Sequence, residues 1–424
     1  MTREKIGRVM LQFLTPILLL TIFWQTRVNI LGAYEVYDYL IPFVYLSDIL
    51  IVLLLIGEFL IEPKWLFRSL KPTARNPSTK FGAGGSWMRW WLTAFLVFVF
   101  FALITSLSIS HPVSAFYKLA KLVLFFMFAL WIERLLNRIG LKQIFLWISV
   151  GLVPLVIIGL LEILFGHSLN LKIIGEWYFS IDNPAIAKTF VLGREIMRPY
   201  VSFPHPNVMG GIMAVFSLVW LTELLGVNHK SQTPNHKQIQ NSNVQKSKLI
   251  LLFVLSVGLF ISFSRSAWLA FLVGSIYIFM QVVGKFKELL RGKNLVIASI
   301  LVVFGLITIL QLGSLLSWDS LSLTRRQELN RVALQVWQDR PLAGVGLSQF
   351  ILSIDKYWDL TQIPRFVQPV HNIPLLILAE TGLIGTFLLF ILIVRPIVIA
   401  WKNLDLRVKL IWLVISITGL VDHY

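Results

Sequence analysis

Long apolar runs alternate with shorter polar segments along all 424 residues of the chain. Runs of about 20 residues are long enough for a helix to cross the hydrocarbon core of a bilayer. The runs are continuous and do not alternate residue by residue, which argues against a β-barrel. We predict an all-α, polytopic integral membrane protein with about eleven transmembrane helices. The candidate spans are 9–31, 40–60, 90–110, 113–133, 143–166, 207–227, 249–264, 267–284, 294–312, 372–398 and 408–424.

The polar segments divide one membrane domain, residues 1–424, without adding a soluble domain. Segment 228–248 is polar and low in complexity, and we predict a disordered cytoplasmic linker there. Two long segments, 167–206 and 313–371, are predicted to lie on the opposite side of the membrane. The composition, 57% hydrophobic and 14% charged, agrees with a membrane protein because soluble domains carry about 25% charged residues.

The net charge of +17 follows from membrane topology. With the amino terminus in the cytoplasm, every cytoplasmic segment is rich in Lys and Arg, as the positive-inside rule requires. The basic excess therefore needs no nucleic-acid partner. The remaining basic residues gather in the two outer segments and at Arg265, where topology does not require them. Those positions are candidates for function.

An amphipathic helix is predicted in the outer segment 313–371. Apolar residues recur there with helical spacing at Leu329, Val332, Ala333, Val336 and Trp337. Thr324 with Gln327 fits a capping box, Pro341 ends the helix, and the GVG of 344–346 makes a turn. We expect the apolar face to lie on the outer membrane surface.

Two arginines of this helix, Arg325 and Arg326, would lie near its positive amino end, which is suited to phosphate. Arg331 follows on the same helix. The alternative interpretation for Arg326 and Arg331 is a solvated helix face.

Arg265, in FSRSAWLA, lies in a tight connection between two crossings at the outer edge of the hydrocarbon. A poorly solvated Arg there costs about 2–3 kcal/mol, so it usually has a partner or a function. A snorkelling interfacial Arg is the alternative.

The stretch VHNIPLLILAETGLIG places polar residues on an apolar helix. Asn372 is predicted to be the N-cap, with Pro374 in the first turn. His371 lies outside, beside the arginine-bearing segment, and imidazole suits a general base near neutral pH. An interfacial residue at the helix start is the alternative for His371. Glu380 is predicted to be buried, and protonated or paired with an Arg.

Carboxylates give less support to a metal site. Glu35 and Asp38 are the acidic pair of the first outer loop, and they are either ordinary outer acidic residues or a catalytic or metal-binding pair. The chain has no DxD sequence and no cysteine, so a Mg²⁺-diphosphate site has poor support and thiolate chemistry is excluded. Several arginines with one histidine suit a lipid-linked diphosphate, because guanidinium groups bind phosphate bidentately and stabilise a departing diphosphate.

Four stretches resemble the O-antigen ligase and polymerase superfamily of bacteria. They are RRQELNRVALQVWQDRPLAGVGLSQF, HNIPLLILAETGLIG, FSRSAWLA and FPHPNVMGG. The likeness covers about 203–385, whereas residues 1–202 match only in hydropathy. The chain departs from the family in having Thr324-Arg325-Arg326 where Ser-Gly-Arg is common, and Asn330 where Trp is common. It also stops after VDHY, where the family usually continues into another span, which would be the twelfth, so we expect a truncated chain.

The resemblance implies a GT-C-like helical fold and a metal-independent glycosyltransferase without cofactors. Its partners would be an undecaprenyl-diphosphate-linked glycan, a glycan or lipid acceptor, and membrane lipids. The reaction would take place at the outer face of the bacterial cytoplasmic membrane. By match, Arg265 and Arg326 bind the diphosphate and His371 activates the acceptor. Our hypothesis adds Arg331 to the residues that hold the departing diphosphate. Asn372 and Glu380 support the helix, and the hypothesis is inverting transfer.

Two rival functions remain open. A transporter or flippase of lipid-linked sugars would also use basic residues on one side of a cavity. It predicts inverted repeats and mid-membrane charges, neither of which is clear, although Asp48 is awkward. A GT-C glycosyltransferase using Glu35 or Asp38 as its base is the second rival.

Overall fold

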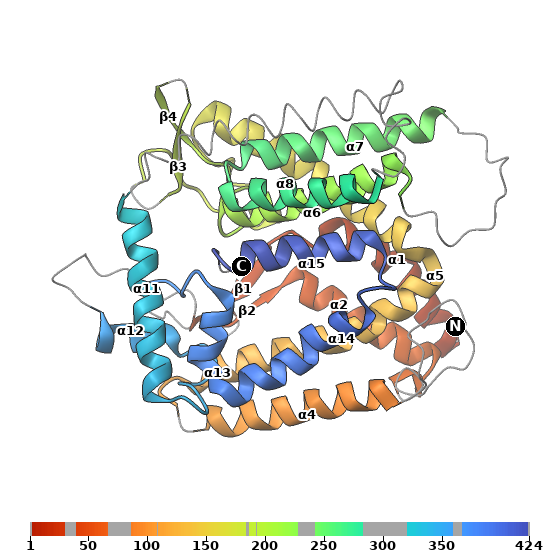
Figure 1. Ribbon diagram of the computed structural model, residues 1–424. Coiled ribbons are helices and arrows are strands. Elements are labelled where there is room, and N and C mark those ends of the chain that lie inside the picture. Colours follow the sequence, from red (N-terminus) through yellow and green to blue (C-terminus); the bar gives the residue numbers. More distant parts are fainter. Residues whose placement is uncertain are drawn as a thin grey trace.

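A computed structural model describes most of the chain, and the described residues are mainly helical (Figure 1). The described ranges are 2–29, 40–66, 86–107, 109–183, 186–191, 193–227, 242–282, 320–358 and 367–422. The first helices are α1 (Arg3–Thr21), α2 (Leu46–Ile61), α4 (Ser86–Ser106), α5 (Pro112–Phe165), α6 (Pro206–Leu225), α7 (Ser242–Ile261) and α8 (Arg265–Val282). The later ones are α11 (Ser320–Asp339), α12 (Phe350–Tyr357), α13 (Ile373–Leu389), the π-helical η6 (Phe390–Val394), α14 (Arg395–Ala400) and α15 (Leu406–Gly419).

Each predicted span overlaps a helix, apart from 294–312, which lies outside the described residues. The first two spans were placed wrongly at one end: α1 stops at Thr21 and residues 27–29 form a strand, whereas residues 43–45 form a strand before α2. Predicted spans 113–133 and 143–166 are joined in α5, which is broken at Gly140 with a φ of 76°. Among the described residues, four helices are long and apolar enough to cross a membrane: α5, α6, Val244–Ile261 of α7, and Ile373–Ala400 from α13 to α14. The expected number of eleven spans stays a prediction.

The long polar segments contain more regular structure than the sequence predicted. Segment 167–206 holds a short 3-10 helix, η2 (Lys172–Ile174), and the antiparallel hairpin of β3 (Lys188–Val191) and β4 (Arg194–Met197). A second antiparallel hairpin joins β1 (Arg27–Asn29) to β2 (Phe43–Tyr45). Helix α7 begins at Ser242, inside the predicted linker 228–248, and residues 228–241 lie outside the described part.

The largest core surrounds α6, which is apolar on all sides and therefore suited to complete burial. Met209, Met213 and Leu218 of α6 are fully buried against Leu155 of α5 and Leu255 of α7. Helices α8 and α15 also pack against α6. This core holds the ends of five helices in fixed relative positions.

Helix α11 differs from its prediction in two respects. It begins at Ser320, so Thr324 lies inside the helix and the predicted capping box is wrong. The predicted apolar face does not meet lipid, because α11 packs on α12 and α13. Its fully buried residues are Leu329, Val332, Ala333 and Val336, which contact Phe350, Ile354, Val370 and Ala379. Figure 1 shows α11 crossing one end of the bundle, the same end as the β3–β4 hairpin.

The turn at 341–346 locks α11 to α13 through backbone contacts, and we call this region the glycine interlock. Helix α13 is broken at Gly382 (φ 62°), and the turn enters the break. The hydrogen bonds are Val345 N to Ala379 O (3.0 Å), Gly346 N to Glu380 O (2.8 Å), Leu383 N to Pro341 O (2.8 Å) and Ile384 N to Leu342 O (3.1 Å). A Cβ added to Gly344 would lie 2.4 Å from the carbonyl carbon of Glu380. The close approach therefore requires glycine.

Candidate functional site

Polar side chains from separate elements meet at Asp422, which lies just beyond α15. Figure 1 shows this end of the chain near α6 and the start of α13. We call the group the Asp422 cluster. Its members are Arg198 (after β4), His205 and Asn207 (start of α6), Ser266 (α8), Arg326 (α11), His371 (before α13) and Asp422.

Asp422 is the centre of the cluster, and its side chain is only 5% exposed. Ser266 Oγ donates to Oδ2 at 2.8 Å, and Asn207 Nδ2 donates to Oδ1 at 3.0 Å. Arg326 Nη2 lies 3.2 Å from Oδ1. Burial would raise the pKa of Asp422, but the His371 contact, the Arg326 charge and the Ser266 hydrogen bond together lower it to about 2. The carboxylate is therefore ionised at neutral pH.

His371 lies at the mouth of α13, as the sequence predicted. The predicted N-cap is confirmed, because Asn372 Oδ1 accepts from Leu375 N at 2.9 Å. His371 Nδ1 is 3.6 Å from Asp422 Oδ1, whereas Nε2 is 3.2 Å from Gln368 Oε1. A carboxylate beside Nδ1 favours the proton on that nitrogen, which requires the Gln368 amide to be turned so that its NH2 group faces Nε2.

Arg326 and Arg198 enter the cluster from elements that are far apart in the sequence. Arg326 also donates from Nη1 to the carbonyl of Val421 at 2.9 Å, and its side chain remains 35% exposed. Arg198 donates to the carbonyl of Ser262 from Nε (3.0 Å) and Nη2 (2.8 Å), and to Asn207 Oδ1 at 2.6 Å. Hydrogen bonds therefore hold both guanidinium groups in fixed orientations within the Asp422 cluster.

Arg265 is placed next to the cluster and not within its hydrogen bonds. It is the first residue of α8, beside Ser266, and its tight connection is confirmed by Phe263 with a φ of 49°. Its side chain is exposed and makes no hydrogen bond or ion pair with the residues that the structure describes. The guanidinium is available to an incoming ligand.

Arg331 is occupied elsewhere. Residues five apart on an α-helix point about 140° away from each other, so Arg331 and Arg326 face different neighbours. Arg331 Nε donates to Glu328 Oε2 at 2.8 Å, and Nη1 donates to Gln335 Oε1 at 2.8 Å. Nη2 donates to the carbonyl of Tyr357, the last residue of α12, at 2.7 Å. The structure therefore does not bring Arg331 to Asp422.

Glu380 belongs to the glycine interlock. It is buried, as expected, but its cationic neighbour is Lys118 of α5, whose Nζ lies 4.0 Å from Oε2, and not an Arg. Its backbone carbonyl accepts from Gly346. Glu380 thus stabilises the break in α13 through its backbone carbonyl, while its buried side chain lies near Lys118.

His205 is a second buried imidazole, with a different role. It is the N-cap of α6, and its Nδ1 accepts from Asn207 N at 3.1 Å. Burial, together with the charge of Arg198, lowers the pKa of His205 to about 3. It is therefore neutral at physiological pH and acts as an acceptor that orders the start of α6.

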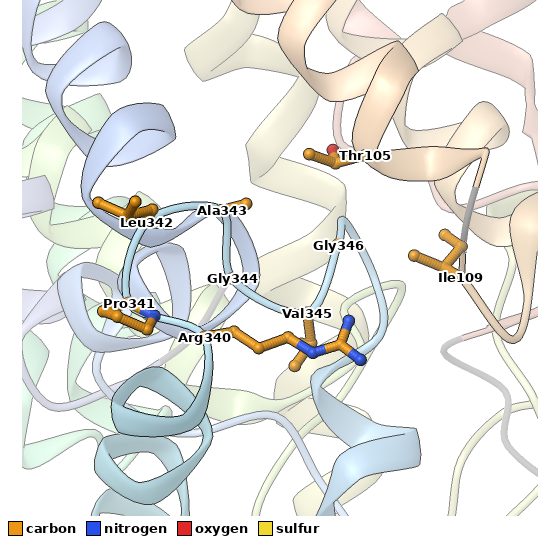
Figure 2. Close-up of a pocket in the computed structure, with 9 residues that line it drawn as sticks. All are labelled: Thr105, Ile109, Arg340, Pro341, Leu342, Ala343, Gly344, Val345 and Gly346. Atoms are coloured by element: carbon orange, nitrogen blue, oxygen red, sulfur yellow. The ribbon is translucent and has the colours of Figure 1, made fainter.

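The structure has a cavity of about 330 Å³ beside the glycine interlock (Figure 2). Residues 340–346 of the turn line it together with Thr105 and Ile109. It shares no residue with the Asp422 cluster, and Figure 2 shows that the Arg340 guanidinium and the Thr105 hydroxyl are its polar side-chain groups. The cavity is therefore separate from the candidate site residues.

Sequence reasoning missed Asp422, Arg198, Asn207 and Ser266 as site residues. Asn207 stands inside the FPHPNVMGG stretch and Ser266 inside FSRSAWLA, so both motifs contained a usable signal. Asp422 was interpreted as the end of an apolar run. Glu35 and Asp38 lie outside the described residues, and no group of three or more His, Cys, Asp or Glu able to hold a metal occurs within the described ranges.

No curated protein matches the chain. The family model described as O-antigen ligase matches residues 250–390, a range that includes Arg265, Ser266, Arg326 and His371. The apolar helices and this match together indicate a bacterial membrane protein. The match over residues 250–390 supports the O-antigen ligase and polymerase superfamily, which the sequence motifs also resemble.

Proposed function

We propose that this protein transfers a glycan from an undecaprenyl-diphosphate donor to an acceptor hydroxyl, with inversion, at the outer face of the bacterial cytoplasmic membrane. The family supports glycosyl transfer as the type of reaction. The observation that carries the proposal is the convergence of His371 and Arg326 on Asp422, at 3.6 Å and 3.2 Å. A base and a phosphate-binding cation are thereby held side by side.

In the proposed reaction, Nε2 of His371 takes the proton from the acceptor hydroxyl. The acceptor oxygen attacks the anomeric carbon on the face opposite the diphosphate. The bond from that carbon to the diphosphate oxygen breaks, and its electron pair leaves on the diphosphate. The imidazolium that forms is stabilised by the ionised Asp422 beside Nδ1.

The departing diphosphate gains negative charge, and guanidinium groups stabilise it as the bond breaks. Arg326 and Arg265 take this role, and Arg198 joins them, held in the cluster by its hydrogen bond to Asn207. Arg331, which the sequence suggested as a further ligand, instead holds α11 against α12. Asn372 begins the helix behind His371, and Glu380 supports the break in α13.

The test is glycan transfer by the purified protein in detergent, where there is no membrane to cross. Wild type should move glycan from donor to acceptor, with or without EDTA, and His371→Ala, Arg326→Ala and Arg265→Ala should lose most of this activity. Full transfer by His371→Ala would remove the base. Loss with EDTA and with Glu35→Gln would instead favour the carboxylate-based glycosyltransferase, and absence of transfer in detergent would favour a transporter.

A further inference from the structure

Glu162 of α5 holds the short stretch 198–201, which contains Arg198 of the Asp422 cluster. Glu162 is fully buried, and its carboxylate accepts hydrogen bonds from the backbone N–H groups of Tyr200 (2.8 Å) and Val201 (3.1 Å). It forms no ion pair with any described residue. A buried carboxylate that accepts hydrogen bonds from backbone N–H groups fixes the position of that backbone.

Glu176 extends the same support to a second stretch of chain. It is 2% exposed and accepts from the N–H groups of Leu169 and Leu171, each at 2.7 Å. The Glu176 side chain lies against that of Glu162. The pair ties residues 169–171 and 200–201 to the end of α5.

The stretch 198–201 is held in a strained conformation. Val201 has a φ of 56°, a region that β-branched residues rarely adopt. Such strain persists only where the surroundings impose it, and it concentrates at functional sites. Gly159, on the same face of α5 as Glu162, lies so close that an added Cβ would be 3.3 Å from side-chain atoms of Pro199 and Val201.

The support continues into the Asp422 cluster through direct contacts. The backbone N–H of Arg198 donates to the carbonyl of Ala187 at 3.0 Å, and the Tyr200 hydroxyl accepts from Ala187 N at 2.9 Å. The Arg198 guanidinium then holds the Asn207 amide, which donates to Asp422. A shift of 198–201 would therefore move both Arg198 and Asn207.

We propose that Glu162 is a positioning residue for glycan transfer, which sets the place of Arg198 by binding the N–H groups of Tyr200 and Val201. Glu162 touches no reactant and acts through the backbone. The inference rests on the proposed function, because it assumes that Arg198 binds the donor diphosphate.

The experiment compares Glu162→Gln with Glu162→Leu by steady-state transfer kinetics. The Gln carbonyl can accept from both N–H groups, and its amide can donate to Glu176, so we expect a KM for the donor within about threefold of wild type. Leu fills similar space without an acceptor, so we expect kcat/KM for the donor to fall about 10- to 100-fold, mostly through KM. Glu223→Leu is the control, because Glu223 pairs with Lys248 and Arg407 away from the cluster. It should lower thermal stability without changing the KM.

A second route covers the case in which Glu162→Leu does not fold. Gly159→Val leaves the Glu162 carboxylate in place, but its side chain would crowd Pro199 and Val201. It should therefore also raise the KM for the donor. Hydrogen–deuterium exchange of residues 198–203 should increase in either variant. An unchanged KM in a folded Glu162→Leu or Gly159→Val protein, with Arg198→Ala impaired, would overturn the inference and leave the proposed function standing. Full transfer by both Arg198→Ala and His371→Ala would overturn the proposed function itself.

Discussion

The glycine interlock and the Asp422 cluster lie at two places along α11 and α13, and both contain residues of the same sequence motifs. The interlock is made of backbone hydrogen bonds and close glycine contacts. The cluster is made of side chains that come from six separate parts of the chain. The same sequence motifs therefore supply backbone packing contacts in the glycine interlock and candidate functional side chains in the Asp422 cluster.

The two regions are physically linked. The interlock fixes the carboxyl end of α11 against the middle of α13, whereas Arg326 lies towards the amino end of α11 and His371 at the start of α13. Since both helices are rigid over these lengths, the interlock helps to set the separation of Arg326 and His371. Substitutions should therefore distinguish the two regions. Changes in the cluster should lower transfer activity, and changes in the interlock should lower the stability of the fold.

The largest effect is expected for His371→Ala. Removal of a general base costs about 10²–10⁴-fold in rate. The thermal unfolding temperature should change little, because His371 is not part of the apolar core. Transfer rates and unfolding of the purified protein measure both quantities. A large loss of stability together with activity would show that His371 has a structural role, as the interlock residues do.

Gly344→Ala should have the opposite signature. Its Cβ would meet the backbone of Glu380 at 2.4 Å, and backbone cannot move aside as a flexible side chain can. We expect a loss of about 3 kcal/mol or more in stability, in the range of severe overpacking. Gly193→Ala is the matched control, because Gly193 also has a positive φ (78°) but an added Cβ there meets nothing within 4 Å. Equal losses in the two variants would show that backbone strain and not the interlock is responsible.

The sequence predicted the helical class, the helix positions and the cap at Asn372 because these depend on local periodicity and local hydrogen bonds. It also indicated His371, Arg265 and Arg326, which lie in motifs. It failed for Thr324 because the helix already includes Ser320, four residues earlier, so Thr324 cannot be the cap. It failed for the apolar face of α11 because periodicity shows that a face is buried but not what covers it.

Asp422 shows the other limit. A lone Asp near residue 424 has no periodic or motif signal, and its place in the cluster depends on four partners that are distant in sequence: Asn207, Ser266, Arg326 and His371. Arg331 shows the converse. It lies in the motif and has the right chemistry, yet its rotation about α11 directs it to Glu328 and Tyr357.

Arg326 and Arg331 offer an intermediate test on one helix. Arg326→Ala should reduce transfer by about 10-fold or more through loss of a charge-assisted contact, with a small change in stability. Arg331→Ala should leave the buried Glu328 without its guanidinium partner and reduce stability by about 2 kcal/mol, while the activity per folded molecule stays close to wild type. Transfer kinetics with unfolding measurements on both variants check this. Reversed outcomes would restore Arg331 as a diphosphate ligand.

The smallest effect concerns His205 and pH. Burial and Arg198 lower the pKa of His205 to about 3 in the folded protein, against about 6.5 for an unfolded histidine. The unfolded state therefore binds a proton as the pH falls below about 6.5, and the folded state does not until about pH 3. The stability from this residue is present above pH 6.5 and is lost progressively down to pH 3.

His205→Asn keeps a side-chain N-cap and removes the titration. Between pH 7 and pH 5, wild type should lose about 1–2 kcal/mol more stability than His205→Asn. Thermal unfolding at both pH values measures the difference, and parallel losses would mean that His205 is protonated in the folded cluster and belongs with its chemistry.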